Sequence, residues 1–268
     1  MGTSADEQWR NFFLKARPAA MERHFLHRLP HDPRCALCNV PFAGPIAPFL
    51  RAIGYRRFER NPRYCTRCYR AINERRNGGA EIELSMLFAD VRGSTPLAER
   101  MTTAEFRGLM DRFYAAGTKV LIDSDAVVER FMGDQVIGHF IPLFAGPRHA
   151  AKAIEAARAL LVATGHGGED EPWIPVGAGV HTGIAWVGAI GNPGQMTEFT
   201  ALGDAVNVAA RLAASAAAGE ILVSEASAAA AGLPADEGEA RVIEVKGKAA
   251  RLDVRALRVE APRTAAAR

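Results

Sequence analysis

Long apolar runs are missing from this sequence of 268 residues, and no stretch reaches the roughly 18 apolar residues that a membrane-spanning helix needs. The opening segment, MGTSADEQWR, also lacks the apolar core of a secretion signal. Cysteine is scarce, with 4 in the chain and none after position 68. These absences predict a cytoplasmic protein without a transmembrane segment, in a compartment where disulfides rarely form.

The charged residues are unevenly distributed along the chain. Residues 1–78 carry 15 Lys and Arg against 6 Asp and Glu, whereas the remainder carries 18 against 24, so the net charge of +3 hides two different parts. The length allows one sizeable core and a small appended domain. We expect a basic module at 1–79 and an acidic body at 80–260. The basic surface is either a solvated Arg-rich face or a contact for nucleic acid, a membrane surface or an acidic partner.

All the cysteines lie in the basic part, as two C-x2-C pairs with 26 residues between them: Cys35, Cys38, Cys65 and Cys68. Two such pairs can place four thiolates around one ion, which is typical of a structural zinc site, with an iron–sulfur cluster as the alternative. A redox dithiol would need only one pair. The pattern predicts a zinc-ribbon-like or helical module in which metal binding contributes much of the folding free energy.

A candidate phosphate and metal site begins in the segment LFADVRGST. An apolar, strand-like run ends there in Asp90, and Gly93, Ser94 and Thr95 then open a helix whose backbone N–H groups can face phosphate oxygens. A second carboxylate, Asp134, lies at the tip of a predicted hairpin in the segment RFMGD. If that hairpin lies beside the first strand, the two carboxylates can hold divalent cations across a reacting phosphate.

A second informative stretch is EFTALGDAVNVAARLAA, which predicts a helix beginning near Asp204. Asn207 and Arg211 are four residues apart and therefore project from one face of this helix. An amide donor and a guanidinium at that spacing suit a charged oxygen centre. Taken alone, the pair is more simply explained as the solvated side of an amphipathic helix. Further along, RVIEVKGK predicts a strand that ends in lysines suited to phosphates.

The periodicity of apolar residues predicts alternating strands and helices in the body. Pro147 is expected at the first position of an Ala-rich helix, where its missing N–H costs little, and Gly183 is expected to separate two buried strands. The tail at 261–268 is expected to be disordered. The expected strands are 81–89, 126–131, 135–141, 176–182, 184–190, 220–224 and 241–248, and the expected helices are 95–100, 103–123, 147–164 and 204–214, with a short helix after 224.

The order of the blocks LFADVRGST, RFMGDQVIGHF, VGAGVHTG, FTALGDAVNVAARL and VKGK resembles the catalytic domain of class III nucleotidyl cyclases, over residues 81–258. The resemblance implies an α/β (α+β) fold of ferredoxin-like type, with helices packed on a largely antiparallel sheet. It also implies a homodimer that cyclises a nucleoside triphosphate for intracellular signalling, with two Mg²⁺ or Mn²⁺ ions in each site. Diguanylate cyclases and polymerase palms also present two carboxylates, but they do not account for the later blocks.

Roles for individual residues follow from the same resemblance. The implied set comprises the metal ligands Asp90, Asp134 and the Val91 carbonyl, the ribose- and α-phosphate-binding pair Asn207 and Arg211, the terminal-phosphate lysine Lys246, and the base-reading residues Thr200 and Arg130. Adenylate cyclases usually have Lys at the position of Arg130, and guanylate cyclases have Glu. Because Arg only donates hydrogen bonds, it suits an acceptor such as adenine N1. We therefore expect ATP as substrate, with GTP, a pyrimidine triphosphate or a non-catalytic nucleotide-binding module as alternatives.

Overall fold

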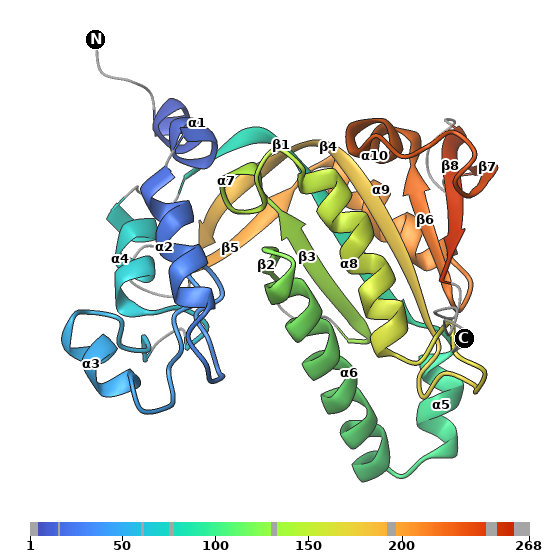
Figure 1. Ribbon diagram of the computed structural model, residues 1–268, viewed down its shortest axis with the longest axis horizontal. Helices are drawn as coiled ribbons and strands as arrows, with labels where there is room; N and C mark the ends of the chain where they lie inside the picture. The colour runs from blue at the N-terminus through green and yellow to red at the C-terminus, as the bar shows by residue number, and fades with distance from the viewer. Residues whose placement is uncertain are drawn as a thin grey trace, which may run out of the picture. The chain divides into compact units, whose positions relative to one another are not determined.

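A computed structural model gives the fold and describes residues 5–15, 17–59, 62–74, 78–129, 133–191, 197–244 and 251–259 (Figure 1). Arg130, Lys246 and the tail at 261–268 lie outside the described residues. The chain forms two compact units. The first comprises Met1–Glu83, Ile141–Pro147 and Ile184–Gly203, and the second comprises Leu84–Phe140, Arg148–Gly183 and Asp204–Arg268.

The second unit contains most of a mixed sheet with the strand order β2-β3-β1-β4-β6-β8-β7. Antiparallel pairs join β1 to β3, β2 to β3, β6 to β8 and β7 to β8, whereas β4 and β6 are parallel. The expected α+β class is thereby confirmed. The strands are β1 (Gly79–Val91), β2 (Val127–Val128), β3 (Gln135–Phe140), β4 (Val176–Gly191), β6 (Glu220–Ser224), β7 (Glu239–Glu244) and β8 (Arg251–Arg258).

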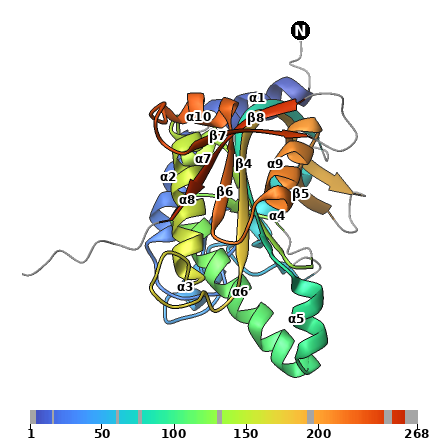
Figure 2. The same ribbon diagram turned by 90° about the vertical axis from the view of Figure 1, so that its right-hand side faces the viewer.

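Helices cover both faces of this sheet. Both α6 and α8 pack against β3, and α9 packs against β6. Figure 2 shows α8 and α9 on opposite sides of β4. A capping box fixes the start of α6, because the Thr102 hydroxyl accepts from the Glu105 N–H while the Glu105 carboxylate accepts from the Thr102 N–H. The helices of this unit are α5 (Ser94–Arg100), α6 (Thr103–Asp123), α8 (His149–Ala163), α9 (Asp204–Ser215) and α10 (Glu225–Ala231).

The first unit is mainly helical, and its helices are drawn in blue and cyan in Figure 1, apart from α7. Helices α1 and α2 pack against α7, and strand β5 (Thr197–Leu202) pairs antiparallel with the later part of β4. Its core contains the buried aromatic side chains Trp9, Phe13, Tyr64 and Phe199. The helices are α1 (Ala5–Lys15), α2 (Arg17–His27), α3 (Ala47–Ala52), α4 (Thr66–Glu74) and α7 (Pro142–Ala145).

Two sequence-based expectations about local structure are wrong. Pro147 does not begin the Ala-rich helix, which starts at His149; a separate short helix, α7, precedes it. Gly183 does not divide two strands, because β4 runs without a break from Val176 to Gly191. A Cβ on Gly183 would lie 3.0 Å from the Cβ of Ala205, so the glycine allows a close approach of α9 rather than a turn. Strand β8 was not expected at all.

A half-buried histidine in the second unit, His181, predicts that stability depends on pH. The Nδ1 atom of His181 lies 2.8 Å from Ser224 Oγ, and burial lowers the pKa of His181 from 6.5 to about 4, although the charge of Asp204 opposes this shift. Below pH 6.5 the unfolded chain takes up a proton here, but the folded chain does not until about pH 4. The stabilisation is therefore complete above pH 6.5 and is lost as the pH falls toward 4.

We expect this histidine to account for a loss on the order of 1–2 kcal/mol in unfolding free energy between pH 7 and pH 5, reduced by the partial solvent access of the ring. Urea unfolding at the two pH values measures the loss. The variant His181→Gln cannot titrate at this position and should lose correspondingly less. Equal losses in both proteins would contradict the assignment.

Candidate active site and cysteine cluster

The two predicted metal carboxylates lie on neighbouring strands of the second unit. In the β1–β3 pair, Asp90 is opposite Gln135, which places Asp134 beside it. The Val91 N–H donates to the Asp134 carbonyl over 3.1 Å, so the strand pairing extends to the ends of both segments. Although 43 residues separate them in the chain, strand pairing brings these carboxylates together.

Each carboxylate is held by a neighbouring side chain. Arg92 makes an ion pair with Asp90 (Nη2–Oδ2 2.6 Å), and Gln135 Nε2 donates to the same oxygen at 3.2 Å. Ser94 Oγ donates to Asp134 Oδ2 at 2.5 Å. Arg92 and Gln135 are additions to the predicted set. Sequence reasoning missed both, and the one signal that could have found them is their position, two residues after Asp90 and one residue after Asp134.

The electrostatics of this pair suit a divalent cation. Burial raises the pKa of Asp90, and the charge of Asp134 raises it further, while Gln135 and Arg92 lower it. Two carboxylates held close together repel one another, and a bound cation relieves that repulsion. Hard carboxylate and carbonyl oxygens are the ligands that Mg²⁺ and Mn²⁺ prefer. The donor set formed by Asp90, Asp134 and the Val91 carbonyl therefore fits these ions.

The predicted phosphate turn lies directly after β1. Gly93 adopts a left-handed conformation (φ 65°, ψ 33°), which glycine reaches without the steric cost that a side chain would add. Helix α5 begins at Ser94, and Gly93 and Thr95 are exposed. The chain therefore turns sharply beside Asp90 and presents the start of a helix, as the sequence predicts.

Helix α9 carries Asn207 and Arg211. On its packed side, Val208 and Leu212 join a cluster of buried apolar residues. The helix lies very close to β4, because a Cβ added to Gly179 would come within 2.3 Å of the Ala213 nitrogen. This close approach holds the helix that carries Asn207 and Arg211 against the sheet.

Arg211 has a buried nitrogen, Nη1, without a hydrogen-bond partner among the described residues. A buried guanidinium nitrogen without a partner costs free energy, so such atoms are rare in folded proteins unless a ligand pairs with them. Asn207, one turn earlier, is exposed. This face of α9 therefore offers donors to an anionic oxygen.

The structure does not place the predicted base-reading and terminal-phosphate residues beside the carboxylates. Thr200 is in β5 of the first unit, is buried, and donates from Oγ1 to the Ala201 carbonyl at 3.4 Å. Arg130 and Lys246 are outside the described residues, so their roles stay predictions. The acidic partner of the basic front module also stays a prediction.

The cysteines of the front module gather at one point. Their sulfur atoms all lie within 4.8 Å of one another, as the two C-x2-C pairs predict. Burial raises the pKa of the Cys35 thiol, but hydrogen bonds from the other cysteines outweigh it and hold that pKa well below its usual value. The pKa values of Cys38 and Cys68 are instead raised well above the usual value, first of all by their hydrogen bonds to Cys35.

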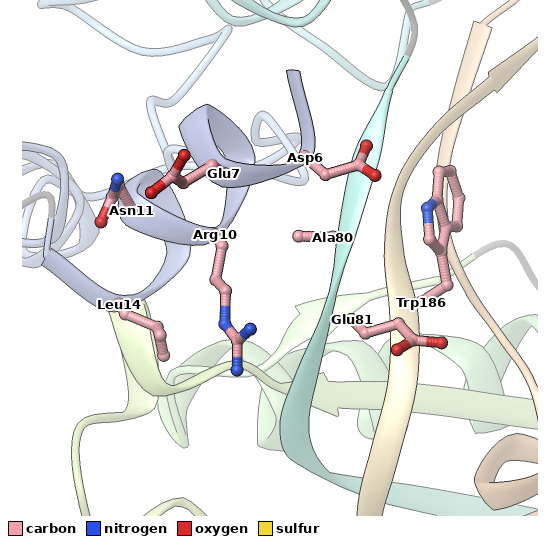
Figure 3. A pocket seen from close by; sticks show the side chains of 8 residues that line it. All are labelled: Asp6, Glu7, Arg10, Asn11, Leu14, Ala80, Glu81 and Trp186. Carbon is pink, nitrogen blue, oxygen red and sulfur yellow. The ribbon is translucent and has the colours of Figure 1, made fainter. Parts of the chain in front are cut away.

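A hollow of about 700 Å³ lies in the first unit, between α1 and strands β1 and β4 (Figure 3). In Figure 3, the side chain of Arg10 extends from α1, and Glu81 lies beside Trp186. The lining has both acidic and basic groups, and it contains none of the predicted site residues. Among the described residues, no helix has the length and apolar character required to cross a bilayer.

Comparison with known proteins identifies the family. The sequence profile described as the adenylate and guanylate cyclase catalytic domain matches residues 80–254. The chain belongs to this family, the class III nucleotidyl cyclases. The matched segment contains the paired carboxylates, the phosphate turn and helix α9, and the predicted resemblance is confirmed.

Among curated relatives, adenylate cyclase 1 of Rhizobium meliloti (strain 1021) is 28% identical over 135 residues, which is 48% of this chain and 20% of that protein. The adenylate cyclase of Anabaena cylindrica is 29% identical over 135 residues, covering 48% of this chain and 26% of that protein. The matches thus span only about a fifth to a quarter of these longer relatives.

Solved structures support the fold. The guanylyl cyclase Cya2 superposes with a TM-score of 0.61 at 22% identity, covering 70% of this chain and 98% of that one. The adenylyl cyclase CyaB from P. aeruginosa gives 0.58 at 24% identity, with coverages of 69% and 97%. The expected cyclase fold is confirmed by both.

Proposed function

We propose that this protein is an adenylate cyclase that converts ATP into 3′,5′-cyclic AMP and pyrophosphate at a homodimer interface. The observation that carries the proposal is the placement of Asp90 near the end of β1 beside Asp134, which directly precedes the paired strand β3, with a glycine turn following. The buried nitrogen of Arg211, which has no partner within the described part of the chain, supports it independently. Relatives named adenylate cyclase add support at the level of the family.

In this proposal, the side chains of the second unit position the substrate. Asp90, Asp134 and the Val91 carbonyl would hold two Mg²⁺ or Mn²⁺ ions, which when bound acidify the ribose 3′-OH and neutralise the triphosphate. Arg211 donates to the α-phosphate as negative charge grows on it, and Asn207 orients the ribose. The 3′-oxygen forms a bond to the α-phosphorus, the bond to pyrophosphate breaks, and no covalent protein intermediate is needed.

The homodimer is supported by exposed apolar side chains on the paired strands β4 and β5. Ile184 is 65% exposed and Leu202 48% exposed, and Ile190 is also exposed. Large apolar side chains gathered on a strand pair mark an interaction surface. In this proposal each site takes its metal carboxylates from one chain and its Asn207–Arg211 pair from the other. Because one chain contains both sets, two identical chains would form two equivalent sites.

The preference for ATP rests on Thr200 and Arg130. Arg130 offers only hydrogen-bond donors, which suits adenine N1 and opposes the N1–H of guanine. The alternatives are a cyclase for GTP or a pyrimidine triphosphate, or an impaired module that only binds nucleotide. The division into a front module at 1–79 and a catalytic domain at 80–260 is part of the proposal, with the front module as a regulatory or dimer-supporting domain.

Pyrophosphate release and cyclic product from ATP, GTP, CTP and UTP, each with Mg²⁺ and with Mn²⁺, test this proposal. We expect turnover of ATP in preference to the others, and its loss in the Asp90→Asn variant, which keeps the shape of the side chain but removes its charge. Product from GTP alone would contradict the assignment of the base. Nucleotide binding without any product would favour the impaired module.

A further inference from the structure

The cysteine cluster of the first unit has the dimensions of a metal tetrathiolate. The Sγ atoms of Cys38 and Cys65 lie 3.8 Å apart, whereas a disulfide requires about 2.05 Å. Four thiolates placed tetrahedrally at about 2.3 Å from a zinc ion are separated by about 3.8 Å. All members are free cysteines, and all but Cys68 are fully buried. The spacing therefore fits one ion rather than paired disulfides.

Backbone N–H groups donate hydrogen bonds to the sulfur atoms of this cluster. The Cys65 N–H donates to Cys35 Sγ at 3.3 Å, and the Cys68 N–H donates to Cys65 Sγ at 3.4 Å. Such donors stabilise negative charge on sulfur. The first pair is closed by a tight turn in which Asn39 adopts a left-handed conformation (φ 59°) and donates its N–H to the Cys35 carbonyl. The loop is folded to present thiolates inward.

A guanidinium ties this turn to the preceding helix. Arg34 donates to the carbonyls of Asn39 at 3.1 Å, His27 at 3.2 Å and Leu29 at 2.5 Å. One side chain thereby joins the first cysteine pair to the end of α2. The cluster is consequently part of the packed unit and not an isolated loop.

The second cysteine pair is joined directly to strand β5. Tyr64, which precedes Cys65, is only 2% exposed, and its hydroxyl accepts the Phe199 N–H at 3.2 Å. Among the described strands, β5 pairs only with β4, so the N–H groups on its other edge need different acceptors. The Phe13 ring packs 5.9 Å from that of Phe199. The position of Cys65 therefore determines how the residue next to Thr200 is supported.

We propose that Cys35, Cys38, Cys65 and Cys68 bind one zinc ion, and that this centre holds Tyr64 against β5 to position the segment carrying Thr200. Zinc favours a closed tetrahedral site of four thiolates and serves there as a structural ion. The first half of the inference stands on the cluster alone. The second half, in which the zinc centre positions Thr200 for substrate recognition, rests on the proposed cyclase function.

Metal content and spectroscopy test the first half without any catalytic assay. Protein purified and dialysed against metal-free buffer should hold one zinc per chain, and Co²⁺ exchanged into it should show the absorption bands of tetrahedral thiolate coordination. The Cys68→Ser variant, which alters the least buried ligand, should lose most of the zinc. Folded protein without zinc and without a cobalt spectrum overturns the site, and bound iron with sulfide overturns the choice of metal.

The variant Tyr64→Phe tests the second half, because it keeps the ring and all the cysteines but removes the acceptor for the Phe199 N–H. We expect one zinc per chain, amide hydrogen exchange in residues 197–202 faster by about 5- to 10-fold, as for a lost hydrogen bond, and a KM for the nucleotide raised by a similar factor with a smaller change in kcat. Unchanged exchange overturns the positioning role even if the protein has no cyclase activity. Faster exchange with unchanged KM in an active enzyme overturns the link to substrate recognition.

Discussion

Replacing Arg211 by alanine is expected to lower kcat for cyclic nucleotide formation by about 10²- to 10³-fold, with the same order of loss for Asn207→Ala. The reason is that the buried Arg211 Nη1 has no partner among the described residues and is available to the charge that develops on the α-phosphate. KM should change much less, because the interaction strengthens in the transition state. Steady-state kinetics with ATP and Mn²⁺ measure both constants.

An arginine on the same unit provides the control. Arg107 on α6 is largely exposed, and its partner Asp111 lies one turn away on the surface, so Arg107→Ala should leave turnover near that of the unaltered protein. Arg211→Lys should recover little, because an ammonium group cannot reproduce the planar donor geometry of a guanidinium. A loss confined to KM in Arg211→Ala would contradict this role, because it would show that the residue binds the ground state and the transition state equally.

Much of the second unit follows from its apolar periodicity. Apolar runs locate β1, β3 and β6, and apolar periodicity predicts α6 over 103–123, as the structure has it. The wrong boundaries occur at glycine and proline, and strand β8 was missed although it contains neither. Gly183 was expected to interrupt a strand, but its missing side chain allows the close approach of Ala205 on helix α9. The need for glycine at position 183 comes from this tertiary contact, and the neighbouring sequence cannot predict the contact.

The sequence singles out Asp90 and Asp134 as candidate site residues, but it does not give the contacts that these carboxylates make. The proximity of Asp90 and Asp134 depends on the register of β1 with β3, which the sequence suggests through a hairpin but does not determine. The Arg92 side chain, which also donates to the Ala214 carbonyl at 2.8 Å, contacts residues more than a hundred positions away. Contacts of that kind are set by the packed fold, so the pairing of Arg92 with Asp90 was not predicted.

The proposed sharing of each site between two chains predicts that two inactive variants restore activity when combined. Chains with Asp90→Ala lack a metal carboxylate, and chains with Arg211→Ala lack the α-phosphate donor, so each homodimer should be inactive. In a mixed dimer, one site combines Asp90 of one chain with Arg211 of the other and is intact, while the second site lacks both. Random assortment of equal amounts makes half of the dimers mixed, so the mixture should reach about a quarter of the unaltered activity.

Co-expression with two different affinity tags allows the mixed dimer to be isolated, and its activity should then be about half that of the unaltered dimer. Two variants of the same kind, Asp134→Ala with Asp90→Ala, form the matched control, because both lesions fall on the metal side and no intact site can arise. If the two residues act within one chain, the Asp90→Ala and Arg211→Ala mixture stays as inactive as this control. Folded mixed dimers without activity would therefore place both halves of the site in a single subunit, and the exposed apolar face of β4 and β5 would then need an explanation other than catalysis.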